Sequence, residues 1–373
     1  MEPLKDLYTY GQSAWLDSVS RSLLRSGKLS NLVASGVTGV TSNPAIFEKA
    51  IAHSNDYDQQ IAELARDKDA VAILRTLMID DIKAACDVFL RLYEKTGGRD
   101  GFVSVEVSPH LADDTLGTIA EAQGLWQDIN RPNVLIKVPA TEAGIPAIKT
   151  LISDGINVNA TLLFSRDMYA KVAKAYISGL EALPKSANLA KIASVASFFI
   201  SRIDNRVDTL LSEKAGPDDA SDGPLAAMKG KTAIANAKLV FQLYRQIYSG
   251  ARWTRLAKRG ACPQRLLWAS TGTKDKSFSD VMYVDELIGP NTINTMPPDT
   301  LEAYRDHGKP GLRLETGLTE ASAHLESLAK CGISLDQVTA ELLVDGVARF
   351  KSAAESLLVA IEQKRRAALT VRV

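Results

Sequence analysis

The sequence predicts an α/β protein built as a (β/α)8 barrel, the TIM-barrel architecture, with additional helices. Short apolar segments alternate along the chain with longer segments whose apolar residues recur at helical spacing, which is typical of a parallel sheet. The short segments number about eight, and eight parallel strands can close into a barrel. No linker-like stretch interrupts the 373 residues, so we expect a single domain over 1–373, with helical insertions and a helical C-terminal extension.

The expected strands are short and end at polar or turn-forming residues. They comprise residues 13–17, 36–44, 101–108, 133–141, 157–164, 192–199, 264–270 and 293–296. In the fourth of these, Val134, Ile136 and Val138 share one face, and Leu135 and Lys137 share the other. If the first face meets covering helices, Lys137 points into the barrel.

A lysine inside an apolar barrel is poorly solvated, which favours the neutral amine that can attack a carbonyl carbon. Lys137 therefore indicates Schiff-base chemistry. Two structural alternatives remain open. A lone strand lysine is also found at a sheet edge, or with its ammonium group extended along apolar surface to water.

Further polar residues fall on the expected strands or at their ends, several of them on the inner face. They are Asp17, Asn43, Glu106, Asn159, Thr161 and Ser197. Burying an unpaired polar group costs about 1–3 kcal/mol, so these residues need each other or a ligand. We expect them to form a network at the C-terminal mouth of the barrel, where barrel enzymes carry their active sites.

Each of these residues has an ordinary structural alternative. Asp17 can serve as a helix N-cap, and Glu106 can form an internal ion pair with Lys137. Asn159 and Ser197 can act as core hydrogen-bonding residues. On the strand of residues 157–164, alternation places Leu162 on the outer face, opposite Thr161.

The expected helices are the segments with apolar residues at helical spacing. They are residues 19–32, two or more helices within 56–94, and residues 115–128, 141–153, 165–180, 200–212, 232–259, 280–287, 319–329 and 335–368. Residues 214–230, rich in Gly, Asp and Ala, are expected to form a surface loop. Near the end of the last helix, Lys364-Arg365-Arg366 is interpreted as a solvated turn.

Composition narrows the classes of partner. The chain has 44 basic and 44 acidic residues, so it offers no net attraction to nucleic acid or to an anionic membrane. Cys86, Cys262 and Cys331 have no metal-site spacing and are expected to be buried free thiols. The four histidines are scattered, so we expect neither a metal nor another cofactor. Without a signal-like start or a membrane-length apolar run, we expect a cytoplasmic protein.

Five motifs occur in a recognisable order. They are Thr41-Ser42-Asn43-Pro44, Val105-Glu106-Val107, Ile136-Lys137-Val138-Pro139-Ala140-Thr141, the segment 155–164 (GINVNATLLF), and Trp268-Ala269-Ser270. Together they resemble the transaldolases, which are class I aldolase-type (β/α)8 barrels. The resemblance spans residues 14 to about 276, and the chain is most similar to a bacterial subgroup with long helical insertions.

The resemblance implies a transferase of carbohydrate metabolism that acts in the non-oxidative pentose phosphate pathway. It implies transfer of a dihydroxyacetone unit from sedoheptulose 7-phosphate to glyceraldehyde 3-phosphate. Lys137 would form the Schiff base, Asp17 would move the proton of the hydroxyl group at the cleaved bond, and Glu106 with Thr161 would hold a catalytic water. The substrate-binding residues implied in this way are Asn43, Asn159, Ser197, Arg202 and Ser270.

The chain departs from the family pattern after Ser270. Many transaldolases carry an aromatic residue and then a phosphate-binding arginine there, whereas this sequence has Thr271-Gly272-Thr273-Lys274. We expect Lys274 to take the place of that arginine, with a solvated loop charge as the alternative. Two rival functions stay open, an aldolase that releases free dihydroxyacetone and a catalytically silent phosphosugar-binding barrel. The chain is expected to be a monomer or a homodimer.

Overall fold

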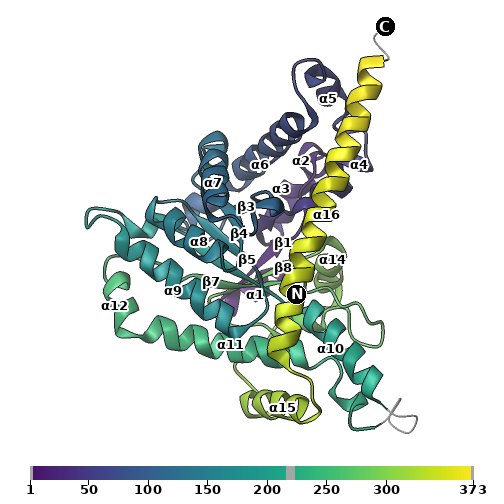
Figure 1. Cartoon of the computed structure of the whole chain (residues 1–373). Helices are drawn as coiled ribbons and strands as arrows, with labels where there is room; N and C mark the ends of the chain where they lie inside the picture. The colour runs from purple at the N-terminus through teal and green to yellow at the C-terminus, as the bar shows by residue number, and fades with distance from the viewer. Residues whose placement is uncertain (1–2, 216–222, 371–373) are drawn as a thin grey trace.

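A closed barrel of parallel strands lies at the centre of the chain (Figure 1). The computed structural model describes residues 3–215 and 223–370. The strands are β1 Gln12–Leu16, β2 Val37–Thr41, β3 Phe102–Glu106, β4 Val134–Pro139, β5 Val158–Leu163, β6 Ser194–Phe199, β7 Arg265–Ala269 and β8 Thr292–Met296. They pair in chain order and β8 closes onto β1, which confirms the predicted α/β barrel. The extent of the domain stays a prediction.

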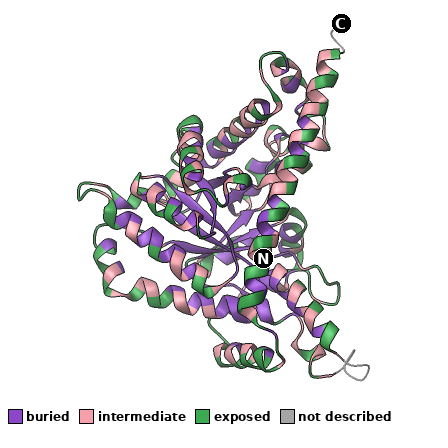
Figure 2. Ribbon diagram, in the orientation of Figure 1, coloured by how far each residue is buried: buried purple, intermediate pink, exposed green. Residues whose placement is uncertain are grey.

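Burial is concentrated in the strands, as Figure 2 shows. At the N-terminal end of the barrel the Arg265 guanidinium group donates to Asp100 Oδ1 at 3.0 Å and to the Thr292 carbonyl group at 2.9 Å. Asp100 is fully buried. This ion pair closes the bottom of the barrel, so a site for small molecules belongs at the opposite, C-terminal end.

Helices surround the barrel. In chain order they are α1 Pro3–Thr9, α2 Arg21–Arg25, α3 Lys28–Ala34, α4 Pro44–Ala52, α5 Asp58–Leu64, α6 Ala70–Lys95, η1 Pro109–Leu111, α7 Thr115–Ile129, α8 Gly144–Ser153, α9 Arg166–Ala182, η2 Leu189–Lys191, α10 Ser201–Lys214, η3 Ala226–Met228, α11 Thr232–Ser249, α12 Ala251–Ala257, α13 Met282–Glu286, α14 Pro298–His307, α15 Leu318–Lys330 and α16 Leu335–Thr370. Helices α7 to α10, α15 and α16 lie within three residues of the predicted ranges.

Some helix predictions are wrong in extent. The helix predicted over 19–32 is two helices, α2 and α3, because Gly27 between them has φ +74°. The region predicted over 232–259 breaks at Gly250 into α11 and α12. Helices α1, α4 and α14 were not predicted. The predicted loop at 214–230 contains η3 in its described part, while 216–222 lies outside the described residues.

Helix α16 is the element that most changes the barrel mouth. This helix of 36 residues runs across the front of the molecule in Figure 1 and contacts α4, α5, α6, α10 and β5. Near its end Lys364 Nζ donates to the Ser54 carbonyl group at 2.8 Å, and Arg365 Nε donates to the Lys68 carbonyl group at 2.9 Å. The interpretation of these two residues as a solvated turn is therefore wrong, because both fasten α16 to the region around α5.

The cysteines and membrane spans were also the subject of sequence predictions. All three cysteines are free thiols, but only Cys86 is buried, and Cys262 is exposed. The prediction that all are buried is therefore wrong. Among the described residues, no helix is long and apolar enough to cross a membrane.

Candidate active site

Lys137 and Glu106 form a buried ion pair inside the barrel. Strands β3 and β4 pair with Glu106 beside Lys137, and Lys137 Nζ lies 3.2 Å from Glu106 Oε2. The two side chains are only 5% and 4% exposed. Lys137 Nζ also donates to the Ser42 carbonyl group at 2.9 Å. Because a closed barrel has no edge strand, the edge-strand alternative for Lys137 is wrong, whereas the ion pair considered for Glu106 is present.

Burial raises the pKa of the Glu106 carboxyl group. The ammonium group of Lys137 acts in the opposite direction, and the negative charge of Asp17 adds to the rise. Such a carboxyl group accepts a proton at a pH where an exposed glutamate stays ionised. The Glu106 carboxyl group can therefore act as a proton acceptor beside Lys137.

Asp17 follows β1 and is anchored from two neighbouring strands. Its backbone N–H donates to the Met296 carbonyl group at 2.8 Å, and Thr41 Oγ1 donates to Asp17 Oδ1 at 2.6 Å. The N-cap of the following helix is Ser20, so the alternative of Asp17 as a helix cap is wrong. Burial raises the pKa of Asp17, against the opposing effects of Lys137 and the Thr41 hydrogen bond.

Asn159 and Ser197 belong to a buried hydrogen-bond network next to Lys137. Asn159 pairs with Lys137 across β4 and β5. Its side chain donates to Ser104 Oγ at 3.1 Å and accepts from Ser197 Oγ at 2.7 Å. The alternative of core hydrogen bonding is therefore present for both residues. Their direct contact with substrate stays a prediction.

Thr161 is buried with a free hydroxyl group, and a bulge follows it. Thr161 Oγ1 has no hydrogen-bond partner among the described residues. The next residue, Leu162, has φ +60°, and the register with β6 shifts between Ala160 and Leu163. A methyl group added at Gly346 of α16 would lie 3.0 Å from Leu162 Cδ2. The prediction that Leu162 continues the outward face of β5 is therefore wrong, because its side chain reaches the helix across the mouth.

Asn43 is the N-cap of α4. Its Oδ1 accepts from the backbone N–H of Ile46 at 3.0 Å, which uses the side-chain oxygen and leaves the amide nitrogen for other partners. Asn43 and Glu106 line one cavity of about 170 Å³, which α16 covers with Leu357 and Leu358. The structure thus brings Asn43 to the mouth beside Glu106, and its role in binding stays a prediction.

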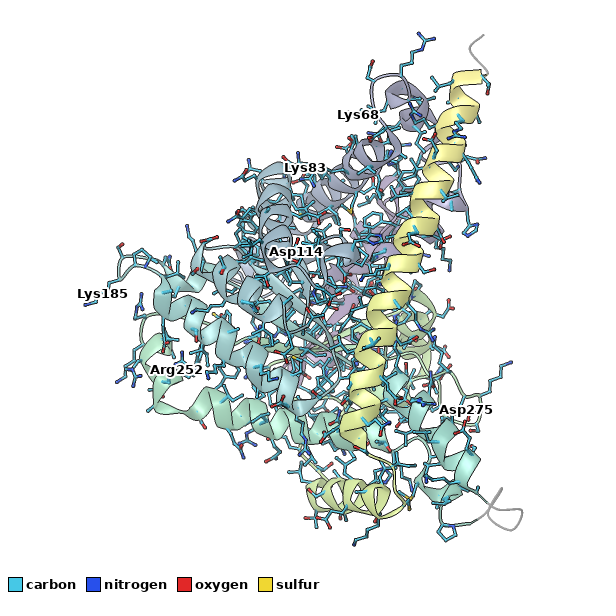
Figure 3. The ribbon with its side chains drawn as sticks, viewed as in Figure 1. Lys68, Lys83, Asp114, Lys185, Arg252 and Asp275 are labelled. Atoms are coloured by element: carbon cyan, nitrogen blue, oxygen red, sulfur yellow. The ribbon has the colours of Figure 1, made fainter. Side chains whose placement is uncertain are left out.

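Arg202, Ser270 and Lys274 line a second cavity, of about 600 Å³. The other lining residues come from α10 and α16 and are Ser201, Asn205, Arg206, Thr209, Glu341, Leu342, Asp345 and Arg349. Ser270 Oγ lies 3.0 Å from Ser201 Oγ, and the Arg202 guanidinium group lies over the Phe199 ring at 5.2 Å. Lys274 therefore reaches the same cavity as Arg202 despite its longer loop. Figure 3 labels Asp275, the next residue in this loop, beside α10.

Sequence reasoning missed several residues of this site. Thr41 and Ser104 lie on predicted strands, but neither was expected to be a hydrogen-bond partner of Asp17 or Asn159. Arg349 and Asp345 lie on the C-terminal helix, far from every motif in the sequence. The alternation of side chains between the two faces of a strand could have identified Ser104, which shares the inner face with Glu106. No local signal in the sequence identifies Asp345 and Arg349 of α16.

The described residues contain no group of three or more His, Cys, Asp and Glu side chains that could hold a metal ion. The site consists of a lysine, two carboxyl groups of raised pKa, and a cavity lined by an arginine and a second lysine. This arrangement can form an imine, move protons at two positions and bind an anion.

Comparisons with known proteins give one family over nearly the whole chain. The family model described as Transaldolase/Fructose-6-phosphate aldolase matches residues 14–361. A protein named Transaldolase from Trichodesmium erythraeum is 47% identical over 368 residues, which cover 97% of each chain. Transaldolase 2 from a Nostoc species is 48% identical over 369 residues, again 97% of each chain. Transaldolase from Thiobacillus denitrificans is 46% identical over 364 residues, which cover 97% of this chain and 100% of the relative.

Proposed function

Because this chain belongs to the transaldolase/fructose-6-phosphate aldolase family, we propose that it is a transaldolase. It transfers a dihydroxyacetone unit from sedoheptulose 7-phosphate to glyceraldehyde 3-phosphate and yields erythrose 4-phosphate and fructose 6-phosphate. The observation that carries this proposal is the buried Lys137 amine at 3.2 Å from the Glu106 carboxyl group. Binding a sugar phosphate needs no buried amine, whereas imine formation does.

In the first step, Lys137 is the nucleophile and Glu106 accepts its proton. The neutral amine adds to the C2 carbonyl carbon of the donor, and the carbonyl oxygen leaves as water to give a protonated imine. The Thr161 hydroxyl group has no hydrogen-bond partner among the described residues, and Glu106 Oε2 faces only the Lys137 ammonium group, at 3.2 Å. Both can therefore hold the water that leaves here and that returns in the final hydrolysis.

The second step breaks the bond between C3 and C4. The Asp17 carboxylate removes the proton of the C4 hydroxyl group, the bond breaks, and its electron pair moves towards the imine nitrogen. The aldose phosphate leaves with C4 as its aldehyde carbon, and a three-carbon enamine stays on Lys137. The raised pKa of Asp17 suits this role, because a base is most effective when its pKa is near the working pH.

The third step runs the second in reverse with another aldose. The enamine carbon attacks the acceptor aldehyde, and Asp17 returns its proton to the new alkoxide. Water then hydrolyses the imine and frees Lys137. We propose that Asn43, Asn159 and Ser197 bind the hydroxyl groups of the three-carbon unit, since all lie at the same end of the barrel as Lys137.

We propose that the cavity of Arg202, Ser270 and Lys274 binds the phosphate group. Arg202 Nη1 has no hydrogen-bond partner among the described residues, and Lys274 forms no ion pair within that part of the chain. Two unpaired cations in one cavity suit a phosphate monoester, which carries nearly two negative charges at neutral pH.

Borohydride trapping tests the proposal. Incubation with fructose 6-phosphate and borohydride should add one reduced dihydroxyacetone unit to the peptide that contains Lys137, detected by mass spectrometry. Lys137→Ala should abolish the label. Lys238→Ala is the matched control, because Lys238 is also buried but donates to the Thr316 carbonyl group on the outside of the barrel. Labelling that survives Lys137→Ala would refute the proposal.

The family description also includes fructose-6-phosphate aldolases, so the aldolase that releases free dihydroxyacetone is the second candidate. Without an acceptor, a transaldolase should release about one equivalent of glyceraldehyde 3-phosphate and stop as the enamine. An aldolase should continue and accumulate dihydroxyacetone. A time course with fructose 6-phosphate alone separates them. The silent-barrel alternative requires no label and no turnover in either assay.

The setting of the enzyme is a separate proposal. We propose that it works in the cytoplasm, which the free thiols Cys86, Cys262 and Cys331 support, since disulfides are uncommon in reducing compartments. We also propose that it is a monomer or a homodimer. Light scattering coupled to size exclusion would decide between these two states and would exclude both if it gave a larger mass.

A further inference from the structure

The cavity beside Arg202 is lined by more cationic side chains than Arg202 and Lys274, the two that the sequence analysis identified. Four cationic side chains line it, and two carboxylates accompany them. The Arg206 guanidinium group pairs with Glu341 at 3.1 Å, and Arg349 Nε donates to Asp345 Oδ2 at 2.6 Å. Arg202 and Lys274 have no carboxylate partner among the described residues. The cavity therefore keeps an excess of positive charge that an anion can balance.

Helix α16 places a second guanidinium group close to Arg202. A methyl group added at Gly346 would lie 3.6 Å from Arg202 Nη1, so the helix backbone approaches Arg202 at this glycine. Arg349 follows three residues later, which places it on the same face of the helix, one turn away. Burial lowers the pKa of Arg202, and the positive charge of Arg349 lowers it further.

Two neighbouring guanidinium groups repel each other, and Asp345 only partly compensates because it accepts from Arg349 alone. An oxyanion between them would remove the repulsion and would receive planar pairs of N–H donors from each group. Arg349 is 67% exposed at its side chain, so it can turn towards such an anion without breaking a buried contact.

We propose that Arg349 of the C-terminal helix is a further phosphate-binding residue, which closes the cavity of Arg202 and Lys274 over the phosphate end of the sugar phosphate. This inference rests on the proposed function for the identity of the phosphate ester. The carboxylate of Asp345 holds Arg349 at the cavity wall when no anion is bound. Specificity for phosphorylated substrates thus depends on a helix that contributes nothing to the imine chemistry.

Arg349→Ala tests this role, and Arg366→Ala is its matched control. Arg366 lies on the same helix and donates from Nε to the carboxylate four residues earlier, Glu362, at 2.7 Å, but it does not line the cavity. Calorimetry with inorganic phosphate measures binding without any catalytic step. Arg349→Ala should weaken phosphate binding by about 10-fold, the range of one charge-assisted hydrogen bond, and Arg366→Ala should leave it at the wild-type value.

Kinetics give the second measurement. With fructose 6-phosphate as donor, kcat/KM of Arg349→Ala should fall by about 10-fold, while borohydride labelling of Lys137 by dihydroxyacetone should fall far less. Wild-type phosphate affinity in Arg349→Ala, or an equal loss in Arg366→Ala, would overturn the inference. Failure of the proposed function has a different signature, because the wild-type protein would then show no label at Lys137 whatever its affinity for phosphate.

Discussion

The two halves of the barrel mouth are built in different ways. Around Lys137, every proposed reacting group sits on or directly after a strand, and the Lys137 and Glu106 side chains are at most 5% exposed. Around Arg202, the cations come from a helix start, a loop and the distant α16, and the side chain of Arg349 is 67% exposed. We refer to these regions as the reaction half and the phosphate half.

The difference follows from what each half has to do. Proton transfer needs groups held within about 3 Å of each other, and strands joined by backbone hydrogen bonds hold side chains most rigidly. A phosphate group is large and charged, and it can be bound by flexible cations that move to meet it. Substitutions in the buried, rigid reaction half should therefore affect activity differently from substitutions in the more exposed phosphate half.

Glu106→Gln should give the largest effect among the following tests, because it removes the proton acceptor of the reaction half and keeps its shape. We expect kcat to fall by about 10²-fold or more, with folding retained. Glu121→Gln is the matched control. Glu121 lines the same cavity as Glu106, and burial also raises its pKa. Its carboxylate accepts a hydrogen bond from the Ser108 backbone N–H, and the side-chain oxygen of a glutamine can accept the same hydrogen bond.

Steady-state kinetics and circular dichroism on both variants check this prediction. Near-normal turnover in Glu106→Gln would mean that the buried ion pair is structural. An equal loss in Glu121→Gln would mean that any change of charge at this cavity is harmful, and the contrast between the halves would lose its chemical basis.

Lys274→Ala should give a smaller effect that depends on the substrate, because it removes one flexible cation of the phosphate half. We expect kcat/KM with fructose 6-phosphate to fall by about 10-fold, and the loss with dihydroxyacetone donors to be smaller by about that factor. Lys276→Ala, two residues away in the same loop and outside the cavity, is the control. Equal losses with both donors would show that Lys274 acts on the reaction half instead.

The same contrast explains what could be predicted from the sequence. Alternation along β3, β4 and β5 placed Glu106, Lys137 and Asn159 on one inner face, and the register pairs them side by side. Period two and parallel pairing are local rules, so a single strand already contains this information. The network of the reaction half was therefore predictable except for partners such as Thr41, whose hydroxyl group carries no signal of its own.

The phosphate half was less predictable because its geometry depends on contacts between distant segments. Leu162 leaves the strand alternation at a bulge, and Gly346 of α16 supplies the space beside it. Arg349 reaches the cavity only because the last helix crosses the mouth, with Lys364 and Arg365 anchored near α5. Neither the crossing nor the anchoring follows from helical periodicity, which describes a face and not its partner.

Thr41→Val should give the smallest effect on rate and should sharpen the comparison within the reaction half. Burial raises the pKa of Asp17, and the hydrogen bond from Thr41 Oγ1 at 2.6 Å opposes that rise by stabilising the carboxylate. Removing the hydroxyl group raises the pKa further. Because Asp17 must be ionised to act as a base, the acid limb of the kcat/KM profile should move to higher pH, with a loss of only a few-fold on the alkaline side.

Thr41→Ser keeps the hydroxyl group and should keep the wild-type profile, so the pair of variants isolates the hydroxyl group, which bonds Asp17 Oδ1 and Thr295 Oγ1, each at 2.6 Å. The profiles should be measured with fructose 6-phosphate and again with a donor that has no phosphate group. The shift between the two variants should be the same for both donors, because the hydrogen bond that Thr41→Val removes is the same whichever donor is bound. A shift towards lower pH, or one seen only with the phosphorylated donor, would mean that the acid limb reports the phosphate half and that Asp17 is not the base.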